Sequence, residues 1–233
     1  MPTVDVTMAS RPLLKVGKYH LAALKQTAET KGLAIAFTPT VNALATAKTA
    51  REQAEDALIE PRATARFAEA GLEVVIHEIA SQAHSSDRKA GGDLVFKAIF
   101  PNGLDAEIRP RGAAQLTAST ALRGRLDSQP AAAPVKAQCL KDLDTAMAAL
   151  GGALESRRMA EQALGLARAA EDGARETFVS SYDSNAGAIR QMFPRNHARQ
   201  DLYFDQIRAG QSSGGDDNNG HDPAPPSPDP KKA

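Results

Sequence analysis

Residues 149–174 read ALGGALESRRMAEQALGLARAAEDGA, a stretch without proline in which small side chains recur at regular intervals. The gaps between these small residues alternate between four and three, as they do along the contact face of a coiled coil. The residues concerned are Ala149, Ala153, Ser156, Ala160, Ala163, Ala167, Ala170 and Ala174. Since small side chains allow two helices to approach closely, the stretch predicts a helix whose small-residue seam packs against a neighbouring helix.

A shorter seam of the same kind occurs in the first half of the chain. It comprises Ala43, Ala47, Ala50, Ala54 and Ala57. The sequence around it also resembles the longer one, because QAEDAL at 53–58 matches MAEQAL at 159–164 at an offset of 106 residues. Further matches at this offset are Leu44 with Leu150 and Arg51 with Arg157. We interpret the resemblance as an internal duplication, with chance alignment of alanine-rich helices as the alternative.

These patterns predict an all-α protein, an antiparallel bundle of about four long helices plus short helices, from two related helical hairpins. The composition agrees with this fold class. Alanine, the best helix former, accounts for 45 of the 233 residues, whereas aromatic residues make up 4% and tryptophan is absent. β-sandwiches and barrels depend on β-branched and aromatic strands, which are scarce here.

The positions of proline and glycine and the spacing of apolar residues predict where the domains and helices begin and end. We expect an extended N-terminal arm at 1–16, a helical bundle domain at 17–209 and a tail at 210–233. Pro39 is expected to be the first residue of a helix, and Pro61 to kink or break one. The expected helices are 18–36, 39–60, 62–83, 111–127, 134–181 and 198–208, with a loop at 85–92.

The stretch 94–108 allows two interpretations. It could form short helices separated by a turn at Pro101-Asn102-Gly103, or a β-hairpin, because Asn-Gly between apolar runs is a hairpin signal. We favour the helical interpretation. The tail from 211 to 233 contains no apolar residue larger than alanine apart from proline, so we expect it to be disordered.

The charge balance and cysteine content restrict the function classes. The chain carries 28 Lys and Arg against 28 Asp and Glu, whereas dedicated nucleic-acid binders usually show a basic excess. We see no signal peptide and no run of 18 apolar residues, and the single Cys139 excludes a disulfide framework. We therefore expect a cytoplasmic protein that binds no membrane and no nucleic acid.

Three residues are weak candidates for a metal site. Glu73 and His77 lie four residues apart on one helical face, and His84 follows two turns later. Di-iron bundles instead use paired Glu-x-x-His motifs, and this sequence contains none. Apolar residues surround Glu73 and His77, so we favour a structural histidine and expect no metal and no cofactor.

Two further features have a structural interpretation beside a functional one. Cys139 lies in KAQCLKDL, a helix interior without a nucleophile signature, and we expect it to be structural. The segment 190–208 mixes arginines with aromatic residues, a combination that can bind single-stranded nucleic acid. Asp201 and Asp205 oppose that function, so we expect this segment to be a packing lid or a contact with a partner.

The sequence therefore predicts a non-enzymatic helical-bundle protein that acts through protein–protein contacts, as a scaffold, adaptor or assembly subunit. We expect it to bind a protein partner or to associate with itself. The alternative is a bundle that binds a metal or small ligand near Glu73 and His77.

Overall fold

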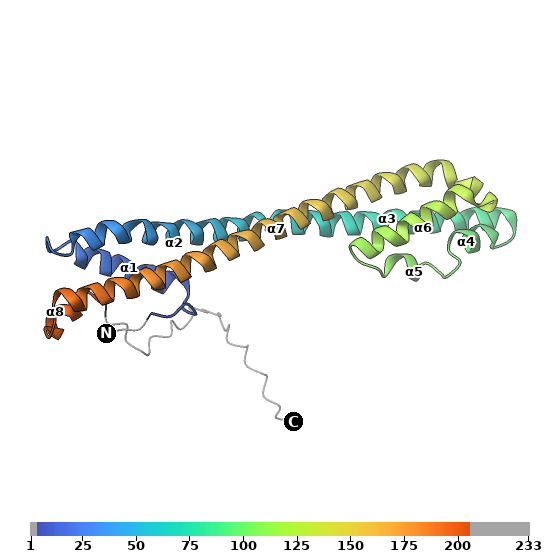
Figure 1. The fold of residues 1–233 in the computed structure, drawn as a ribbon. Helices are drawn as coiled ribbons and strands as arrows, with labels where there is room; N and C mark the ends of the chain where they lie inside the picture. The colour runs from blue at the N-terminus through green and yellow to red at the C-terminus, as the bar shows by residue number, and fades with distance from the viewer. Residues whose placement is uncertain (1–3, 206–233) are drawn as a thin grey trace, which may run out of the picture.

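The computed structural model describes residues 4–205, which form an elongated rod of helices (Figure 1). The described residues contain no strand. The helices are α1 (Ser10–Leu24), α2 (Lys31–Ala57), α3 (Ile59–Ala90), α4 (Leu94–Ile99), α5 (Asp105–Ile108), α6 (Ala113–Ser128), the 3-10 turn η1 (Pro130–Ala132), α7 (Ala133–Met192) and α8 (His197–Asp201). The all-α antiparallel bundle is thus confirmed, while the tail at 210–233 lies outside the described residues.

Two long helical rods run the length of the molecule. The first consists of α2 and α3, which meet at Leu58 and continue in nearly the same direction. The second is α7, which runs antiparallel beside them for 60 residues (Figure 1). α1 packs against α2 and α7 at one end, and α6 packs against α3 and α7 at the other. We call the pair formed by α2–α3 and α7 the ribbon.

Two prolines in the first rod behave differently. α2 ends at Ala57 and α3 begins at Ile59, so the helix is interrupted near Pro61 as expected, although Leu58 itself keeps right-handed helical angles, with φ −79° and ψ −17°. Pro61 then lies in the first turn of α3, where backbone N–H groups have no acceptor within the helix. The expectation that Pro39 starts a helix is wrong, because α2 begins at Lys31 and passes through it. The turn before α2 is closed by Thr30, whose buried hydroxyl donates to the Leu24 carbonyl at 2.7 Å.

The extended arm expected at 1–16 is shorter than predicted. α1 begins at Ser10, because Pro12 falls in the first turn, where its missing N–H costs no helical hydrogen bond. The helix expected at 18–36 is in fact two helices, separated by the turn that follows Leu24.

The loop expected at 85–92 is also mostly helical. α3 continues until Gly91, whose φ of 71° is the left-handed conformation that commonly ends helices. Asp87, in the last turn of α3, accepts hydrogen bonds at 2.8 Å from the backbone N–H groups of Val95 and Phe96. The polar residues that suggested a loop therefore continue one helix and hold the start of the next.

The remaining boundaries concern short helices. Of the two alternatives for 94–108, the helical one is confirmed, since α4 and α5 occupy this stretch. The last helix, expected at 198–208, is shorter: α8 ends at Asp201, and 206–208 lie outside the described residues. Asn196 caps its start by accepting from the Arg199 N–H at 3.1 Å.

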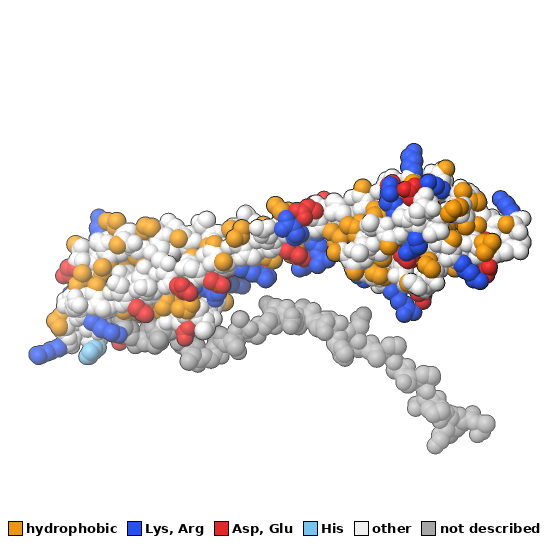
Figure 2. Space-filling model, turned by 45° about the vertical axis from the view of Figure 1, so that its right-hand side comes forward, with side chains coloured by type: hydrophobic (Ala, Val, Ile, Leu, Met, Phe, Trp, Pro, Cys, Tyr) orange, Lys and Arg blue, Asp and Glu red, His pale blue; other side chains and the backbone are white. Residues whose placement is uncertain are grey.

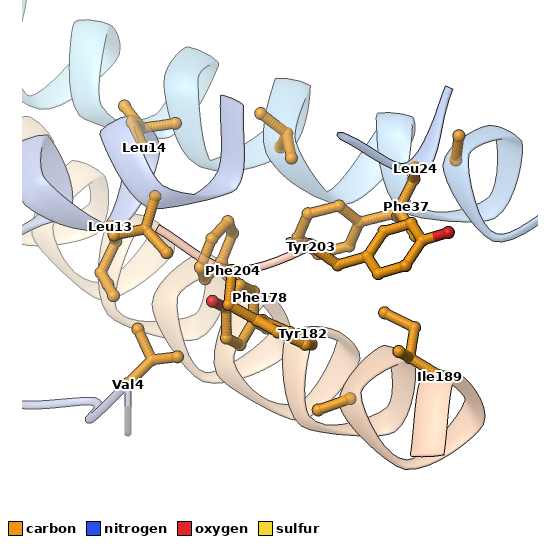
Figure 3. Close-up of a cluster of buried hydrophobic side chains, with 14 of the residues drawn as sticks. Val4, Leu13, Leu14, Leu24, Phe37, Phe178, Tyr182, Ile189, Tyr203 and Phe204 are labelled. Carbon is orange, nitrogen blue, oxygen red and sulfur yellow. The ribbon is translucent and has the colours of Figure 1, made fainter. Parts of the chain in front are cut away.

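The rod has two separate hydrophobic cores, one at each end. The core beneath α1 is aromatic and includes Phe37, Phe178, Tyr182, Tyr203 and Phe204. Figure 3 shows these rings beside the leucines of α1. The core beneath α6 is aliphatic and includes Leu72, Ile76, Ile79, Leu122, Leu126, Leu143 and Leu150. Between the two cores the ribbon is narrow, and Leu58, Ala65 and Leu164 are buried there.

The small-residue seam faces the neighbouring helix with only half of its members. Ala153 is buried and Ala160, Ala167 and Ala174 are half-buried, seven residues apart. Leu150, Leu164 and Phe178 lie on the same contact face at intervals of fourteen residues, with Arg157 and Glu171 at the heptad positions between them. The other half of the predicted seam is exposed and comprises Ala149, Ser156, Ala163 and Ala170. The expectation of a single inward seam is corrected accordingly.

The two helical hairpins, α1 with α2 and α6 with α7, repeat in structure as well as in sequence. In α1 the side facing the ribbon consists of Leu13, Gly17, His20 and Leu24, all buried. In α6 it consists of Gln115, Ser119, Leu122 and Leu126, each 102 residues later and also buried. On the long rods, the ion pair of Arg51 with Glu55 recurs 106 residues later between Arg157 and Glu161. Because the short helices are offset by 102 residues and the long helices by 106, the connection between short and long helix is four residues longer in the second hairpin.

Candidate functional site

The three candidate metal ligands do not form a cluster. Glu73 makes an ion pair with Arg111, and His77 is exposed. His84 is also exposed, and its ring stacks on Phe96 with the ring centroids 4.0 Å apart. Among residues 4–205, no group of three or more His, Cys, Asp and Glu side chains is placed to hold a metal ion. Glu73 and His84 thus have other contacts, and His77 lies on the surface.

Cys139 sits inside the aliphatic core. Its Sγ lies 3.2 Å from the Gln82 Oε1 atom, and burial is the main cause that raises the pKa of its thiol to about 11. At neutral pH the thiol is therefore favoured over the thiolate, which is the nucleophilic form. Packing and a weak hydrogen bond account for its presence.

The aromatic residues of the segment 190–208 are occupied in packing. Phe193, Tyr203 and Phe204 are buried in the aromatic core, where Phe193 stacks on Tyr203 at a centroid distance of 5.9 Å. The Arg199 guanidinium lies 3.8 Å from the centre of the Phe193 ring and pairs with Glu29 at 2.5 Å. Rings held in this way offer no stacking surface to a nucleic-acid base. The described part of the segment therefore closes one end of the bundle.

His20, which the sequence did not single out, is a fully buried polar residue of that end. Its Nδ1–H donates to the Tyr203 carbonyl at 2.8 Å, and its Nε2 lies 3.3 Å from the Asn185 amide nitrogen, which donates to it. Aromatic rings of Phe37, Tyr182 and Phe204 surround the imidazole. Burial lowers the pKa of His20, so the neutral form is favoured. This arrangement fixes the C-terminal segment to α1 and leaves no substrate access.

Charged residues gather at the junction between α1 and the ribbon. The nearly buried carboxylate of Glu171 accepts from the Ser10 hydroxyl and pairs with the Arg51 guanidinium at 2.5 Å. Arg175 reaches the carbonyls of Val6 and Met8 at 3.4 Å. These groups line an open cavity of about 570 Å³. Because each acid here has a basic or hydroxyl partner, the cluster joins α1 to the ribbon.

An apolar groove on the ribbon is not covered by any other helix of residues 4–205. It has a volume of about 640 Å³ and lies between α3 and α7. Its lining consists of Thr64, Phe67, Ala68, Gly71, Leu72, Val75, Asp142, Thr145, Ala146 and Ala149. The ring of Phe67 on its rim is 80% exposed, an unusual position for phenylalanine.

The groove opens on the side of the ribbon that α6 leaves uncovered. A Cβ added to Gly71 would meet nothing within 4 Å, whereas one added to Gly151 would lie 3.8 Å from the Leu116 side chain of α6. The groove also extends along the ribbon, because Thr64 and Ala149 belong to series of exposed residues spaced seven apart. These series are Ala43, Ala50, Ala57, Thr64 and Gly71 on the first rod, and Ala149, Ser156, Ala163 and Ala170 on α7. The exposed half of the seam is therefore one wall of a long, uncovered face.

Sequence reasoning missed both Phe67 and this face. The seven-residue spacing was visible, but both halves of the seam have nearly the same side chains, so the sequence could not show which half faces outward. Figure 2 shows the narrow middle of the rod from one side, with charged side chains gathered at that point. Large exposed hydrophobic residues elsewhere include Ile35, Ile59, Val74, Leu94, Leu166 and Leu202.

Comparison of the chain with protein-family models, with curated proteins and with solved structures gives no significant match. No helix within residues 4–205 is both long enough and apolar enough to cross a membrane. The function must therefore be argued from the groove and the ribbon.

Proposed function

We propose that this protein is a non-enzymatic contact protein, a scaffold, adaptor or assembly subunit, whose ribbon binds a partner. The observation that carries the proposal is the groove between α3 and α7, with the exposed ring of Phe67 on its rim. Aromatic residues beside small-residue hollows are the usual anchors of protein interfaces. A rigid rod with one long uncovered face is suited to such contacts.

The proposal distinguishes this surface from the other buried and charged groups of the molecule. His20, Cys139 and Glu171 all have partners within the described protein, so each is explained by packing. Within residues 4–205, the groove combines an apolar lining, an exposed position and the lack of a covering helix. A partner helix could fill it with apolar side chains at heptad spacing.

A photo-crosslinking amino acid placed at Phe67 in the native host tests the proposal. We expect covalent adducts of defined mass, because a bound partner must cover this ring. The matched control carries the same group at Ile59, which is 65% exposed on the same helix but does not line the groove. Equal or absent labelling at both positions would contradict the proposed contact surface.

A further inference from the structure

We propose that the partner on this surface is a second copy of the same chain, bound through its own ribbon. The inference rests on the proposed function and names the occupant. We define the open face as ten residues: Ala43, Ala50, Ala57, Thr64 and Gly71 on α2–α3, and Asp142, Ala149, Ser156, Ala163 and Ala170 on α7. A two-fold dimer joins identical faces, so the open face must be complementary to itself.

The charge of the open face meets this requirement. Nine of its ten residues are Ala, Gly, Ser or Thr, and only Asp142 is charged, in a chain with 24% charged residues. A face with a net charge would repel its own copy, whereas a nearly neutral face does not. The charged residues of the narrow middle are engaged elsewhere, for example Arg168 with Glu55 and Arg157 with Glu161. The open face therefore suits a second copy better than a strongly charged partner.

The size of the open face also agrees with a stable dimer. At 1.5 Å per residue, the stretch from Ala43 to Gly71 is about 40 Å long, and two helices 8–10 Å apart make a surface about 20 Å wide. The resulting footprint of about 800 Å² per copy equals the area that each partner buries in a standard protein interface. Packing of the two ribbons would turn each narrow middle into part of a four-helix arrangement.

The groove supplies both halves of a self-complementary contact. Phe67 projects from its rim, and the small side chains of Ala68, Gly71, Ala146 and Ala149 leave the hollow beside it. In a two-fold dimer, the ring of each copy enters the groove of the other. The tail of the chain lacks such a group, because its apolar residues from 211 to 233 are only alanine and proline.

Sedimentation of the full chain tests the proposal with two glutamate variants. The wild-type protein should sediment as a dimer at micromolar concentration. Gly71→Glu should weaken the dimer at least about tenfold, because a charged side chain would then be buried in an apolar contact without a partner. Both Gly71 and Gly165 are exposed glycines with open space around them, so neither substitution disturbs the fold. Gly165→Glu, on the ribbon but outside the open face, should sediment like the wild type.

Disulfide trapping adds a positional test. Phe67→Cys protein mixed with Ala149→Cys protein should form a cross-linked heterodimer on mild oxidation. Ile59→Cys mixed with Ala149→Cys is the control and should not cross-link. The native Cys139 is buried and does not interfere.

The outcomes separate this inference from the proposed function. A wild-type chain that stays monomeric at about 100 μM, or two glutamate variants that dimerise equally, would overturn the second copy as occupant. If Phe67 still cross-links to a different protein in the host, the proposed function stands with another partner. If neither dimer nor adduct forms, both proposals fail.

Discussion

The two ends of the rod have the same helical arrangement around different cores. At one end α1 covers an aromatic core built around Phe37, Phe178 and Tyr182. At the other end α6 covers an aliphatic core built around Leu72 and Leu122. Because the arrangement survives this exchange of side chains, heptad spacing on the long helices specifies the hairpin more than the identity of the core residues does.

Corresponding positions show how each end adapts. Phe178 of the aromatic end corresponds to Leu72 of the aliphatic end at the offset of 106. The larger ring needs more room, and Gly17 supplies it on α1, whereas α6 has Ser119 at the corresponding place. The ends also differ in their buried polar groups. His20 is hydrogen-bonded, while the hydroxyl of Ser119 has no hydrogen-bond partner among the described residues.

The largest expected effect concerns the independence of the two cores. Phe178→Ala should lower the free energy of unfolding by about 3–5 kcal/mol, because it empties the centre of the aromatic core. Hydrogen exchange should rise in α1 and stay unchanged in α6, because Phe178 has no place in the aliphatic core. Leu72→Ala is the reciprocal control and should raise hydrogen exchange in α6 but not in α1. Faster exchange at both ends in either variant would show that the ribbon couples the cores.

The next prediction compares Gly17 with Ser119. A Cβ added to Gly17 would lie 2.5 Å from the Phe178 ring, so Gly17→Ala should destabilise the protein by about 1–3 kcal/mol. Ser119→Ala removes a buried hydroxyl without a partner and should be neutral or stabilising by up to about 1 kcal/mol. Chemical denaturation of the two variants measures both. Equal effects would mean that the ends do not differ in their closeness of packing.

Much of the fold was predictable because it depends on local periodicity. The long helices, the break near Pro61 and the duplication followed from spacing and from the offset of 106 residues. The sequence could not show which half of the seam faces the neighbouring helix. Alternate members such as Ala160 and Ala163 are chemically identical, and only the packed neighbour distinguishes them. His20 was missed because its partners, Tyr203 and Asn185, are more than 160 residues away in the chain.

The inward half of the seam can be tested against the rest of the helix surface. Ala160→Leu and Ala54→Leu should each destabilise the protein by about 1–3 kcal/mol, because both alanines are half-buried between the rods. Ala169→Leu on the exposed surface of α7 is the control and should be nearly neutral, since leucine is almost as good a helix former as alanine. Seam variants that match the control in chemical denaturation would show that the rods are not closely packed there.

The smallest expected effect is a pH dependence confined to the aromatic end. Burial lowers the pKa of His20 below its ordinary 6.5, so the folded protein favours the neutral imidazole. The contribution of neutral His20 to the free energy of unfolding is therefore complete above pH 6.5. It is lost as the pH falls from 6.5 towards the lowered pKa, because the unfolded chain then binds a proton that the folded protein does not. His20→Leu introduces the side chain that the other end has at Leu122.

Between about pH 7.5 and about pH 5.5, the His20→Leu protein should lose less stability than the wild type. At the higher pH it should be the less stable of the two, because Asn185 and the Tyr203 carbonyl lose their hydrogen-bond partner. Carboxylates titrate in both proteins and cancel in the comparison. The change in the stability of the wild-type protein over the same pH range gives the reference slope. A His20→Leu protein with that same slope would show that His20 is protonated as easily in the fold as in the unfolded chain. The aromatic end would then be no more sensitive to acid than the aliphatic end.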